Sequence, residues 1–369
     1  MNRLSHLLAY TLAAIFGLTG HADILLVCQN GCQYSSIADA IAAADDGDTI
    51  QLIAETYEVD ASISLQGKAV RLVGTTDSSG APASIIDGQG SVQIFVCDSG
   101  EQSSTILDTL VIQNGYSPSG PSGGGAVLID STSPSFLNCH FIDNTSDLWG
   151  GAVSMIQNGA GPTQPTFTNC LFHGNAAGAG GAISGGLFVE PAIATCTFSM
   201  NTAIQGGGLW FTGVSSTTVS NCTFSDNTAA ATGPNESPEG GAVYTAGIVL
   251  SNCVLSGNTP DGLYNFSNGL KGAPTPVRLV DTIICGNTDG DSSVQVTGIV
   301  EHVGETRIHP RCEDSFDLGD LDQDGDVDPA DWELLGHELG ICPADLNLDG
   351  IINGKDVGLL FTFWGPCLP

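Results

Sequence analysis

Two acidic segments near the carboxyl end carry residue types and spacings that suit metal binding. Residues 320–331 are DLDQDGDVDPAD and residues 345–356 are DLNLDGIINGKD, so the two copies begin 25 residues apart. Each has oxygen-bearing side chains at loop positions 1, 3, 5, 9 and 12 and a glycine at position 6. A twelve-residue loop with this spacing can surround one calcium ion with oxygen atoms. We therefore predict two bound Ca²⁺ ions, with an acidic flexible tail as the alternative.

The predicted ligands are the side chains at those five positions and the main-chain carbonyl at position 7. They are Asp320, Asp322, Asp324, Asp328 and Asp331 with the carbonyl of Asp326 in the first loop, and Asp345, Asn347, Asp349, Asn353 and Asp356 with the carbonyl of Ile351 in the second. The first set contains five carboxylate side chains and the second contains three.

The residues around these loops resemble a type I dockerin, an EF-hand-like module that lacks the entering helix. Position 12 is aspartate, no helix is predicted before either loop, and the apolar segments WELLGHEL and VGLLFTFWG follow them. The resemblance covers residues 317–369 and implies a small all-α domain that docks to a cohesin-like or surface protein. Alternatively, the module is only a folded cap or a sorting tail. A pull-down with and without a chelator separates docking from capping.

The amino end has the pattern of a secretory signal peptide. Arg3 and His6 precede an apolar run from Leu7 to Leu18, and small residues, Gly20 and Ala22, stand at the −3 and −1 cleavage positions. We predict a signal peptide over residues 1–22 and a secreted, extracellular or cell-surface mature protein. No later stretch approaches the roughly 18 apolar residues of a membrane span.

The charge of the chain argues against two classes of partner. The formal net charge is −32, and no lysine or arginine lies between Arg71 and Lys271. Binding to nucleic acid or anionic lipid requires several cations to replace counterions. We therefore expect no binding to nucleic acid or to anionic lipid. We expect a soluble exported protein whose negative charge attracts divalent cations.

A repeat of 26 to 31 residues organises the middle of the chain. Strong copies such as NCHFIDN and NCTFSDN alternate with paired glycines and short strand-prone runs such as GGAVSM and GGAVYT. A unit this small cannot bury its own apolar face, so neighbouring units must stack as coils of a parallel β-solenoid. Equivalent residues would then lie roughly 4.8 Å apart.

Two columns of repeated residues are predicted to line the interior. Stacked side-chain amides can bond one another and the turn backbone, and the predicted asparagine ladder is Asn114, Asn144, Asn175, Asn201, Asn227, Asn258 and Asn287. The predicted thiol ladder is Cys139, Cys170, Cys196, Cys222 and Cys253. The thiols would be buried apolar filler or would form one or two disulfides between adjacent coils.

The repeats and the segment before them resemble two groups of β-helix proteins. Phe-x-x-Asn with Gly-Gly-Ala-Ile/Val/Leu over residues 105–290 resembles the repeats of polymorphic outer membrane proteins, which implies a surface-associated, adhesin-like role. The sequence from Tyr34 to Asp60, one amphipathic helix and then a strand, looks like the N-terminal cap of pectate-lyase-type right-handed β-helices. We therefore predict an all-β right-handed parallel β-helix over residues 23–312, with its cap at 23–60, followed by the dockerin-like domain.

The remaining cysteines suggest disulfides in an exported protein. We expect a local bridge between Cys28 and Cys32, and a second pairing of Cys285 with Cys312. Cys342 and Cys367 each lie 22 residues after the first aspartate of their loop. A twofold-related module would give them comparable surroundings, so we expect them to pair.

Catalysis is not indicated by any motif that we can place. Asp143 and Asp226 share one repeat position but lie three coils apart, roughly 14 Å, beyond the 5–9.5 Å of a glycosidase pair. A pair across coils from other loop carboxylates stays open: Asp130, Asp147 and Glu190. His140 and His173 are interpreted as surface histidines, because the sequence places no serine or cysteine partner near either of them.

The sequence favours a secreted or surface β-helix that binds carbohydrate or another surface and docks through its calcium module. Phe211 and Tyr244, counted to the same outward position on adjacent coils, are candidate sugar-stacking residues, with turn packing as the alternative. The alternative function is a polysaccharide lyase or glycoside hydrolase recruited through its dockerin.

We expect the first loop to bind calcium more tightly than the second, because five carboxylates attract a divalent cation more strongly than three. Calorimetric titration of the full chain should resolve two binding steps. Asp320→Ala should remove the tighter step, and the matched variant Asp345→Ala should remove the weaker one. A single step in the unmodified chain, or a tighter step that survives Asp320→Ala, would contradict this order.

Overall fold

The structure, a computed structural model, describes most of the chain between residue 22 and residue 309. The described residues are 22–309 apart from 119, 121–122, 160–162, 214–216, 232, 234–236, 267–275 and 289–294, together with Cys312. The chain divides into two units, residues 1–308 and 309–369. The predicted dockerin-like domain lies outside the described residues.

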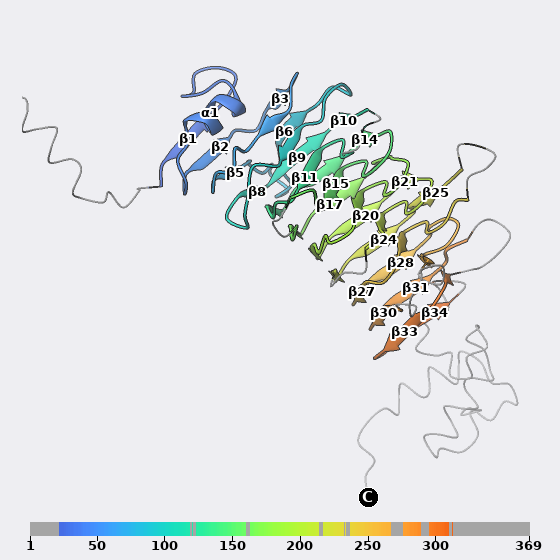
Figure 1. The fold of residues 1–369 in the computed structure, drawn as a ribbon. Helices are drawn as coiled ribbons and strands as arrows, with labels where there is room; N and C mark the ends of the chain where they lie inside the picture. The colour runs from blue at the N-terminus through green and yellow to red at the C-terminus, as the bar shows by residue number, and fades with distance from the viewer. Residues whose placement is uncertain are drawn as a thin grey trace, which may run out of the picture. The chain divides into compact units, whose positions relative to one another are not determined.

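Three parallel β-sheets wind around one core, and most coils of the solenoid contribute one strand to each sheet (Figure 1). This arrangement confirms the predicted all-β parallel solenoid. Sheet 1 contains, in spatial order, β1 (Ile24–Val27), β2 (Thr49–Leu52), β5 (Arg71–Val73), β8 (Ile106–Asp108), β12 (Ser135–Leu137), β16 (Thr166–Thr168), β19 (Ala192–Ala194), β23 (Thr218–Ser220), β27 (Val249–Ser251), β30 (Val277–Val280) and β33 (Val300–Val303).

Sheets 2 and 3 follow the same order along the solenoid. Sheet 2 contains β3 (Thr56–Glu58), β6 (Ser84–Asp87), β9 (Leu110–Gln113), β13 (His140–Ile142), β17 (Leu171–His173), β20 (Thr197–Ser199), β24 (Thr223–Ser225), β28 (Val254–Ser256), β31 (Ile283–Cys285) and β34 (Arg307–His309). Sheet 3 contains β4 (Ile63–Ser64), β7 (Phe95–Cys97), β11 (Val127–Asp130), β15 (Val153–Ile156), β18 (Ile183–Gly185), β22 (Leu209–Phe211), β26 (Val243–Thr245), β29 (Leu263–Asn265) and β32 (Val296–Thr297).

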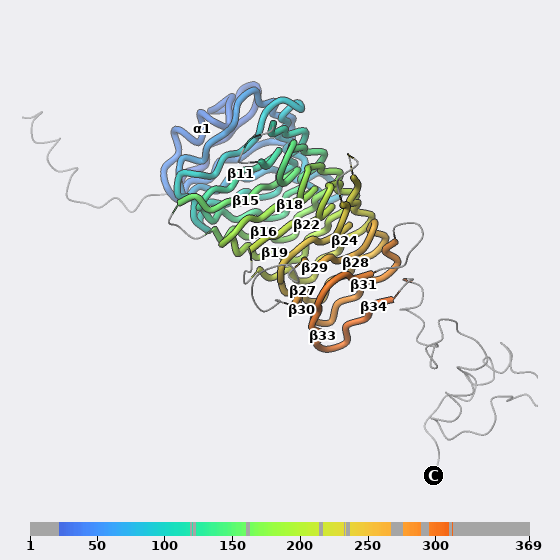
Figure 2. The backbone as a smooth tube through the Cα atoms, turned by 45° about the vertical axis from the view of Figure 1, so that its right-hand side comes forward, coloured from blue at the N-terminus to red at the C-terminus, as the bar shows by residue number. Residues whose placement is uncertain are grey.

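Two further two-stranded sheets lie on the turn after sheet 2. They pair β10 (Tyr116–Ser117) with β14 (Thr145–Ser146), and β21 (Thr202–Ala203) with β25 (Thr228–Ala229). Figure 2 shows the successive coils as nearly parallel loops of the backbone. Because strands are only two to four residues long, alternation places one or two side chains of each strand inward and the rest outward.

A ladder of buried asparagine side chains runs inside the turn that follows sheet 2. Each Nδ2 atom donates to the Oδ1 atom of the asparagine one coil further on at 2.8–3.0 Å, and the main-chain N–H of the same residue donates to that oxygen as well. The second Nδ2 hydrogen reaches a main-chain carbonyl. The ladder consists of Asn144, Asn175, Asn201, Asn227, Asn258 and Asn287, and it ends on the Oε1 atom of Gln295.

Asn114, which was predicted to belong to this ladder, lies one position away from it. The pairing of β9 with β13 gives Asn114 the position of Asp143. Gly115 therefore stands at the ladder position, where its main-chain N–H donates to Asn144 Oδ1 at 2.8 Å. The predicted alignment of this repeat was wrong by one residue. Aligning Asn114 with the other asparagines shifts the inward apolar residues of its strand away from their true partners on the next coil.

Phenylalanine rings fill the interior beside the asparagine ladder. Equivalent rings on successive coils stack face to face with centroids 4.6–4.8 Å apart, in the order Phe141, Phe172, Phe198 and Phe224. A second stacked pair, Phe136 and Phe167, has centroids 5.0 Å apart. All six are fully buried. The strand spacing of parallel sheets is close to the thickness of stacked rings, so identical residues can repeat without voids.

Helix α1 (Ile37–Ala43) covers the N-terminal end of the core, as predicted for a cap (Figure 1). Its buried residues are Ile37, Ala40 and Ile41. Lys68, on the following coil, donates from Nζ to three carbonyl oxygens at the C-terminal end of α1, those of Ile41, Ala42 and Ala44, at 2.7–2.9 Å. A cation there satisfies helix carbonyls that lack an intrahelical partner.

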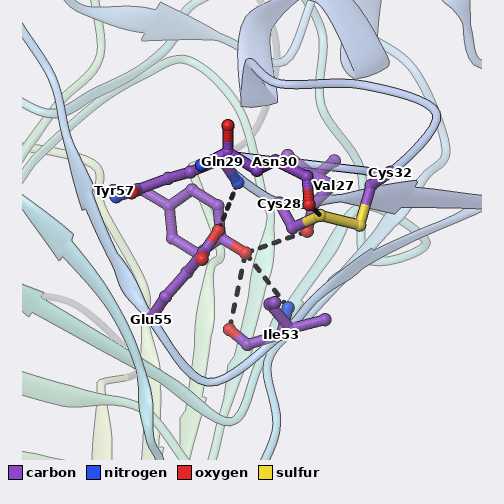
Figure 3. The surroundings of a disulfide bond; sticks show 8 residues. All are labelled: Val27, Cys28, Gln29, Asn30, Cys32, Ile53, Glu55 and Tyr57. Carbon is purple, nitrogen blue, oxygen red and sulfur yellow. Dashed lines mark hydrogen bonds between the residues drawn. A yellow bond between two sulfur atoms is a disulfide. The ribbon is translucent and has the colours of Figure 1, made fainter.

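The predicted bridge between Cys28 and Cys32 is present, with Cα atoms 5.4 Å apart (Figure 3). Beside it the buried hydroxyl of Tyr57 donates to the carbonyl of Val27 at 2.9 Å and accepts from the main-chain N–H of Ile53 at 3.1 Å. These contacts join the cap to the next coil. Two further cysteines that were predicted to pair are each disulfide-bonded, Cys285 and Cys312.

We expect Asn201→Leu to lower the free energy of unfolding by about 3 kcal/mol, because it leaves the Asn175 amide and the Phe172 carbonyl without partners. The matched control Thr223→Leu replaces an exposed residue of a neighbouring coil and should change stability by roughly 0.5 kcal/mol or less. Denaturant unfolding followed by circular dichroism measures both. Equal effects of the two variants would show that the ladder adds nothing.

Candidate functional site

A column of residues with positive φ angles marks the corner between sheets 1 and 2. We call Thr109, Asn138, Asn169 and Thr195 the corner column; their φ angles are 58°, 51°, 54° and 56°. The left-handed conformation turns the chain within a single residue, and asparagine tolerates it better than most residues. Each main-chain N–H donates to a strand carbonyl of the next coil. The column is therefore rigidly tied to the stack, while its side chains remain exposed or partly exposed.

A groove of about 540 Å³ lies along the corner column. One wall is the loop between β5 and β6, where Thr76 bridges to Pro82 and the Asp77 carboxylate accepts from the main-chain N–H groups of Ser79 and Ala81. The groove is lined by Thr76, Gly80, Ala81, Pro82, Thr109, Asn138, His140, Asn169, Cys170, Leu171, Thr195 and Thr197. The three coil steps from Thr109 to Thr195 give it a length of roughly 14 Å.

A directed series of hydrogen bonds leads into this groove. Asn169 Nδ2 donates to Asn138 Oδ1 at 2.8 Å, and Asn138 Nδ2 donates to Asp108 Oδ1 at 2.8 Å. The other carboxylate oxygen of Asp108 accepts from the Arg71 guanidinium. Burial opposes the charge on Asp108, but the hydrogen bonds from Arg71, Asn138 and Thr109 outweigh it and lower the pKa of this carboxyl.

The series leaves one acceptor open at its groove end. Every amide in it points its N–H group toward Asp108, so every amide oxygen points toward the next coil. Among the described residues, no donor reaches the Oδ1 atom of Asn169, whose side chain is exposed. The lining of the groove therefore includes an open hydrogen-bond acceptor on an amide that is held by Asn138.

His140 supplies the imidazole of the groove, although the sequence indicated only a surface histidine. Its ring is partly buried on the outer side of β13, and desolvation lowers its pKa below the ordinary value of 6.5. A lowered pKa keeps the imidazole neutral at neutral pH, with one donor and one acceptor nitrogen. Its position was missed because the groove wall comes from residues some sixty positions earlier in the chain.

His173 has a serine partner that the sequence did not place. The Nδ1 atom of His173 lies 2.8 Å from the Oγ atom of Ser199 on the next coil. A serine nucleophile needs a base that is itself oriented by a third group. In the described part of the chain, no carboxylate bonds to the other nitrogen of this ring. The pair therefore links two coils without forming a triad.

Each carboxylate that the sequence left open bonds an uncharged side chain. Asp130 accepts from the amide of Asn158, and Glu190 accepts from the side chain of Gln164 at 2.9 Å. Asp147 accepts from the hydroxyl of Tyr116 at 3.2 Å. None of these three bonds joins one carboxylate to another, and none of the residues that line the groove is acidic.

Phe211 and Tyr244, the predicted sugar-stacking pair, do not share an outward position. Tyr244 pairs with Trp210 of β22, and Phe211 points into the core, where it is 1% exposed. Tyr244 stacks on Tyr264 at 5.3 Å and on Phe266 at 4.8 Å between ring centroids. The error arose in the count from the glycine pair, which placed Phe211 one residue nearer to the glycines than it lies. Trp210 holds the position that pairs with Tyr244. The Tyr244 ring is therefore packed against aromatic rings of its own neighbourhood, as the alternative of turn packing expects.

The five cysteines of the predicted thiol ladder are buried free thiols: Cys139, Cys170, Cys196, Cys222 and Cys253. Main-chain N–H groups of Cys170 and Cys196 each donate to the sulfur one coil further on, at 3.4 and 3.3 Å. The inward positions are thus filled by small apolar groups, and the alternative of disulfides between adjacent coils does not occur. Burial raises the pKa of Cys139 to about 12.

The predicted calcium ligands, from Asp320 to Asp356, lie outside the described residues, as do Cys342 and Cys367. Within residues 22–309, as far as they are described, no group of three or more histidine, cysteine or acidic residues could hold a metal ion. In that same part no helix is long and apolar enough to cross a bilayer.

Comparison with known proteins gives one repeat match and several distant folds. The family model of the Chlamydia polymorphic membrane protein repeat matches residues 221–246, which include Phe224 and Asn227. No curated protein sequence matches the chain. The chain is similar to pectate lyase Pel9A, with 13% identity, a TM-score of 0.49, and coverage of 91% of this chain and 87% of that one.

Two further solved structures are similar at lower scores. A pectin methylesterase from Aspergillus niger has 17% identity and a TM-score of 0.43, with coverage of 77% of this chain and 92% of that one. A mannuronic acid specific polysaccharide family 6 lyase from human gut microbiota has 11% identity and a TM-score of 0.33, with coverage of 78% and 83%.

We expect the ladder thiols to resist alkylation in the folded protein, because the reactive thiolate forms only near the raised pKa of about 12 for Cys139. A folded pKa above the unfolded value means that stability is lost as pH rises past about 8.5, the ordinary thiol pKa. Iodoacetamide labelling at pH 8 with peptide mass spectrometry measures each site, and the denatured chain is the control. Rapid labelling of Cys139 without denaturant would disprove its burial.

Proposed function

We propose that this protein is a secreted or cell-surface β-helix that binds glycan chains in the corner groove. The same proposal includes a C-terminal module that binds two calcium ions and docks the β-helix to a protein partner. The single observation that carries the glycan proposal is the groove itself, a concave surface of hydroxyls, amides and a neutral imidazole on a rigid stack.

Sugars are recognised through many hydroxyl groups, so their sites need donors and acceptors at fixed spacings. The side chains of Asn138 and Asn169 offer amides one coil apart, and hydroxyls stand at both ends of the column in Thr109 and Thr195. Because these residues repeat with the coil, a ligand with repeating units can make similar contacts on successive coils. Leu171 adds an apolar patch for the less polar face of a sugar ring.

The calcium module rests on the chemistry of its donor set. Carboxylate, amide and carbonyl oxygens are the ligands that calcium prefers, and each loop supplies six of them at the spacing of a single-ion shell. A docking module would place the glycan-binding β-helix on a scaffold or cell surface. Capping of the solenoid remains the competing role of this module.

Binding without turnover is favoured over polysaccharide cleavage. General acid–base cleavage of a glycosidic bond requires two carboxyl groups near the bond, and the residues that line the groove supply none. Among the residues that line the groove, none supports the enzymatic alternative.

We expect the protein to bind at least one insoluble or soluble polysaccharide in a panel, and to release no new reducing ends from it. Asn169→Gly should weaken that binding about tenfold, because it deletes the open acceptor and the donor to Asn138 while glycine keeps the positive φ angle. Affinity electrophoresis or calorimetry with the bound polysaccharide measures the change.

The matched control is Asn221→Gly, which removes an asparagine from the same corner, also with positive φ (53°), two coils beyond Asn169 and outside the groove. It should leave affinity unchanged. Equal losses in the two variants would refute the groove as the binding site, and new reducing ends would favour the enzyme.

A further inference from the structure

We propose that the corner groove selects uncharged glycans over uronate-containing ones, and that it orients them by accepting a sugar hydroxyl at Asn169 Oδ1. This inference rests on the proposed glycan function and adds the chemical class of the ligand and the direction of its central hydrogen bond.

The groove has no positive charge to offer a carboxylate. All of its lining residues lie between positions 76 and 197, and no lysine or arginine occurs from residue 72 to residue 270. The nearest cations in sequence are already engaged. Lys68 is bonded to the C-terminal carbonyls of α1, and Arg71 is paired with Asp108.

The surrounding charge adds repulsion to this lack of attraction. The chain carries a formal net charge of −32, so a polyanionic glycan approaches a surface of the same sign. A uronate carboxylate placed in the groove would lose water and find only amide, hydroxyl and imidazole groups in return. Burial of a charge without a counter-ion is unfavourable, whereas a hydroxyl of an uncharged sugar can exchange its water bonds for amide bonds at little cost.

The directed hydrogen-bond series decides which partner atom the groove accepts at its centre. Arg71 fixes Asp108, Asp108 fixes the Asn138 amide, and Asn138 fixes the Asn169 amide, each through a charge-assisted or amide hydrogen bond. Because Asn169 Nδ2 is already used, its Oδ1 atom is the group turned to the ligand. The charged pair at the start of the series polarises the amides that follow it. The ligand must therefore supply a hydrogen-bond donor to the Asn169 oxygen. A sugar hydroxyl can donate to this atom, whereas a carboxylate that occupied the same position could not.

His140 completes the uncharged lining on the sheet 2 side of the corner. Desolvation lowers its pKa, so the ring is neutral at neutral pH and adds no charge to the groove. It can donate to a ring or hydroxyl oxygen, or accept from a hydroxyl, according to its tautomer. The site thus pairs one fixed acceptor with one adaptable imidazole.

The test compares one polysaccharide backbone in two charge states at pH 7. Polygalacturonate and the same material after reduction of its carboxyl groups differ only at that group, where a charged carboxylate becomes an uncharged alcohol. We expect the full chain to bind the reduced form at least tenfold more tightly. In 0.5 M sodium chloride this ratio should fall without disappearing. Salt screens the general repulsion between protein and polyanion, but it does not place a counter-ion in the groove.

A charge-switch variant tests whether the groove itself makes the selection. Thr197→Lys places an ammonium on an exposed groove position of β20, and it should raise affinity for polygalacturonate about tenfold. The matched control Thr223→Lys adds the same charge at the paired position one coil further on, outside the groove, and should change it less than twofold.

The outcomes separate the two proposals. If the unmodified chain binds both forms equally, or prefers the uronate, the selection is refuted while the glycan function stands. If Thr197→Lys and Thr223→Lys act alike, the groove is not the selecting site. If neither form binds and no polysaccharide in the wider panel does, the glycan function fails and this inference fails with it.

Discussion

The inter-coil amide hydrogen bond is the interaction on which the rest of the structure depends. Each inward asparagine from Asn144 to Asn287 uses both amide hydrogens, and each from Asn175 to Asn287 receives two bonds at its oxygen. A buried amide with every group satisfied costs little, whereas one unpaired group would cost about 1–3 kcal/mol. Because each amide can pair only when the coils are in register, the ladder makes a slip between coils unfavourable. The stacked phenylalanine rings then pack at the spacing that the ladder fixes.

The same stacking produces an amide series on the outer corner, with a different ending. The inner ladder closes on Gln295 and leaves no free acceptor along its length. The outer series begins at the Arg71–Asp108 pair and stops at Asn169, where a threonine follows on the next coil. One geometry thus gives a satisfied structural column inside and, outside, an open acceptor that we propose as a recognition group. Rigid placement of such a group reduces the ordering cost of binding.

Charge is distributed so that the cations of the N-terminal coils serve the fold. Lys68 completes the C-terminal end of α1, and Arg71 holds Asp108 at the start of the corner series. Between Arg71 and Lys271 all charged side chains are acidic, and Asp130, Asp147 and Glu190 bond amides or a hydroxyl. A surface of this kind has little affinity for polyanions.

Local and periodic patterns in the sequence were sufficient to predict the parallel solenoid, the helical cap, the Cys28–Cys32 bridge and most of the inward asparagines and cysteines. They suffice because a short repeat that buries one face must stack, whatever its loops do. The register of single side chains between coils was decided by tertiary structure. Asn114 and Phe211 were each misplaced by one residue because similar residues were aligned, whereas pairing of the inward apolar residues sets the register between coils. The groove, the open oxygen of Asn169 and the His173–Ser199 contact exist only once residues from different coils meet, since each is made of side chains that lie far apart in the chain.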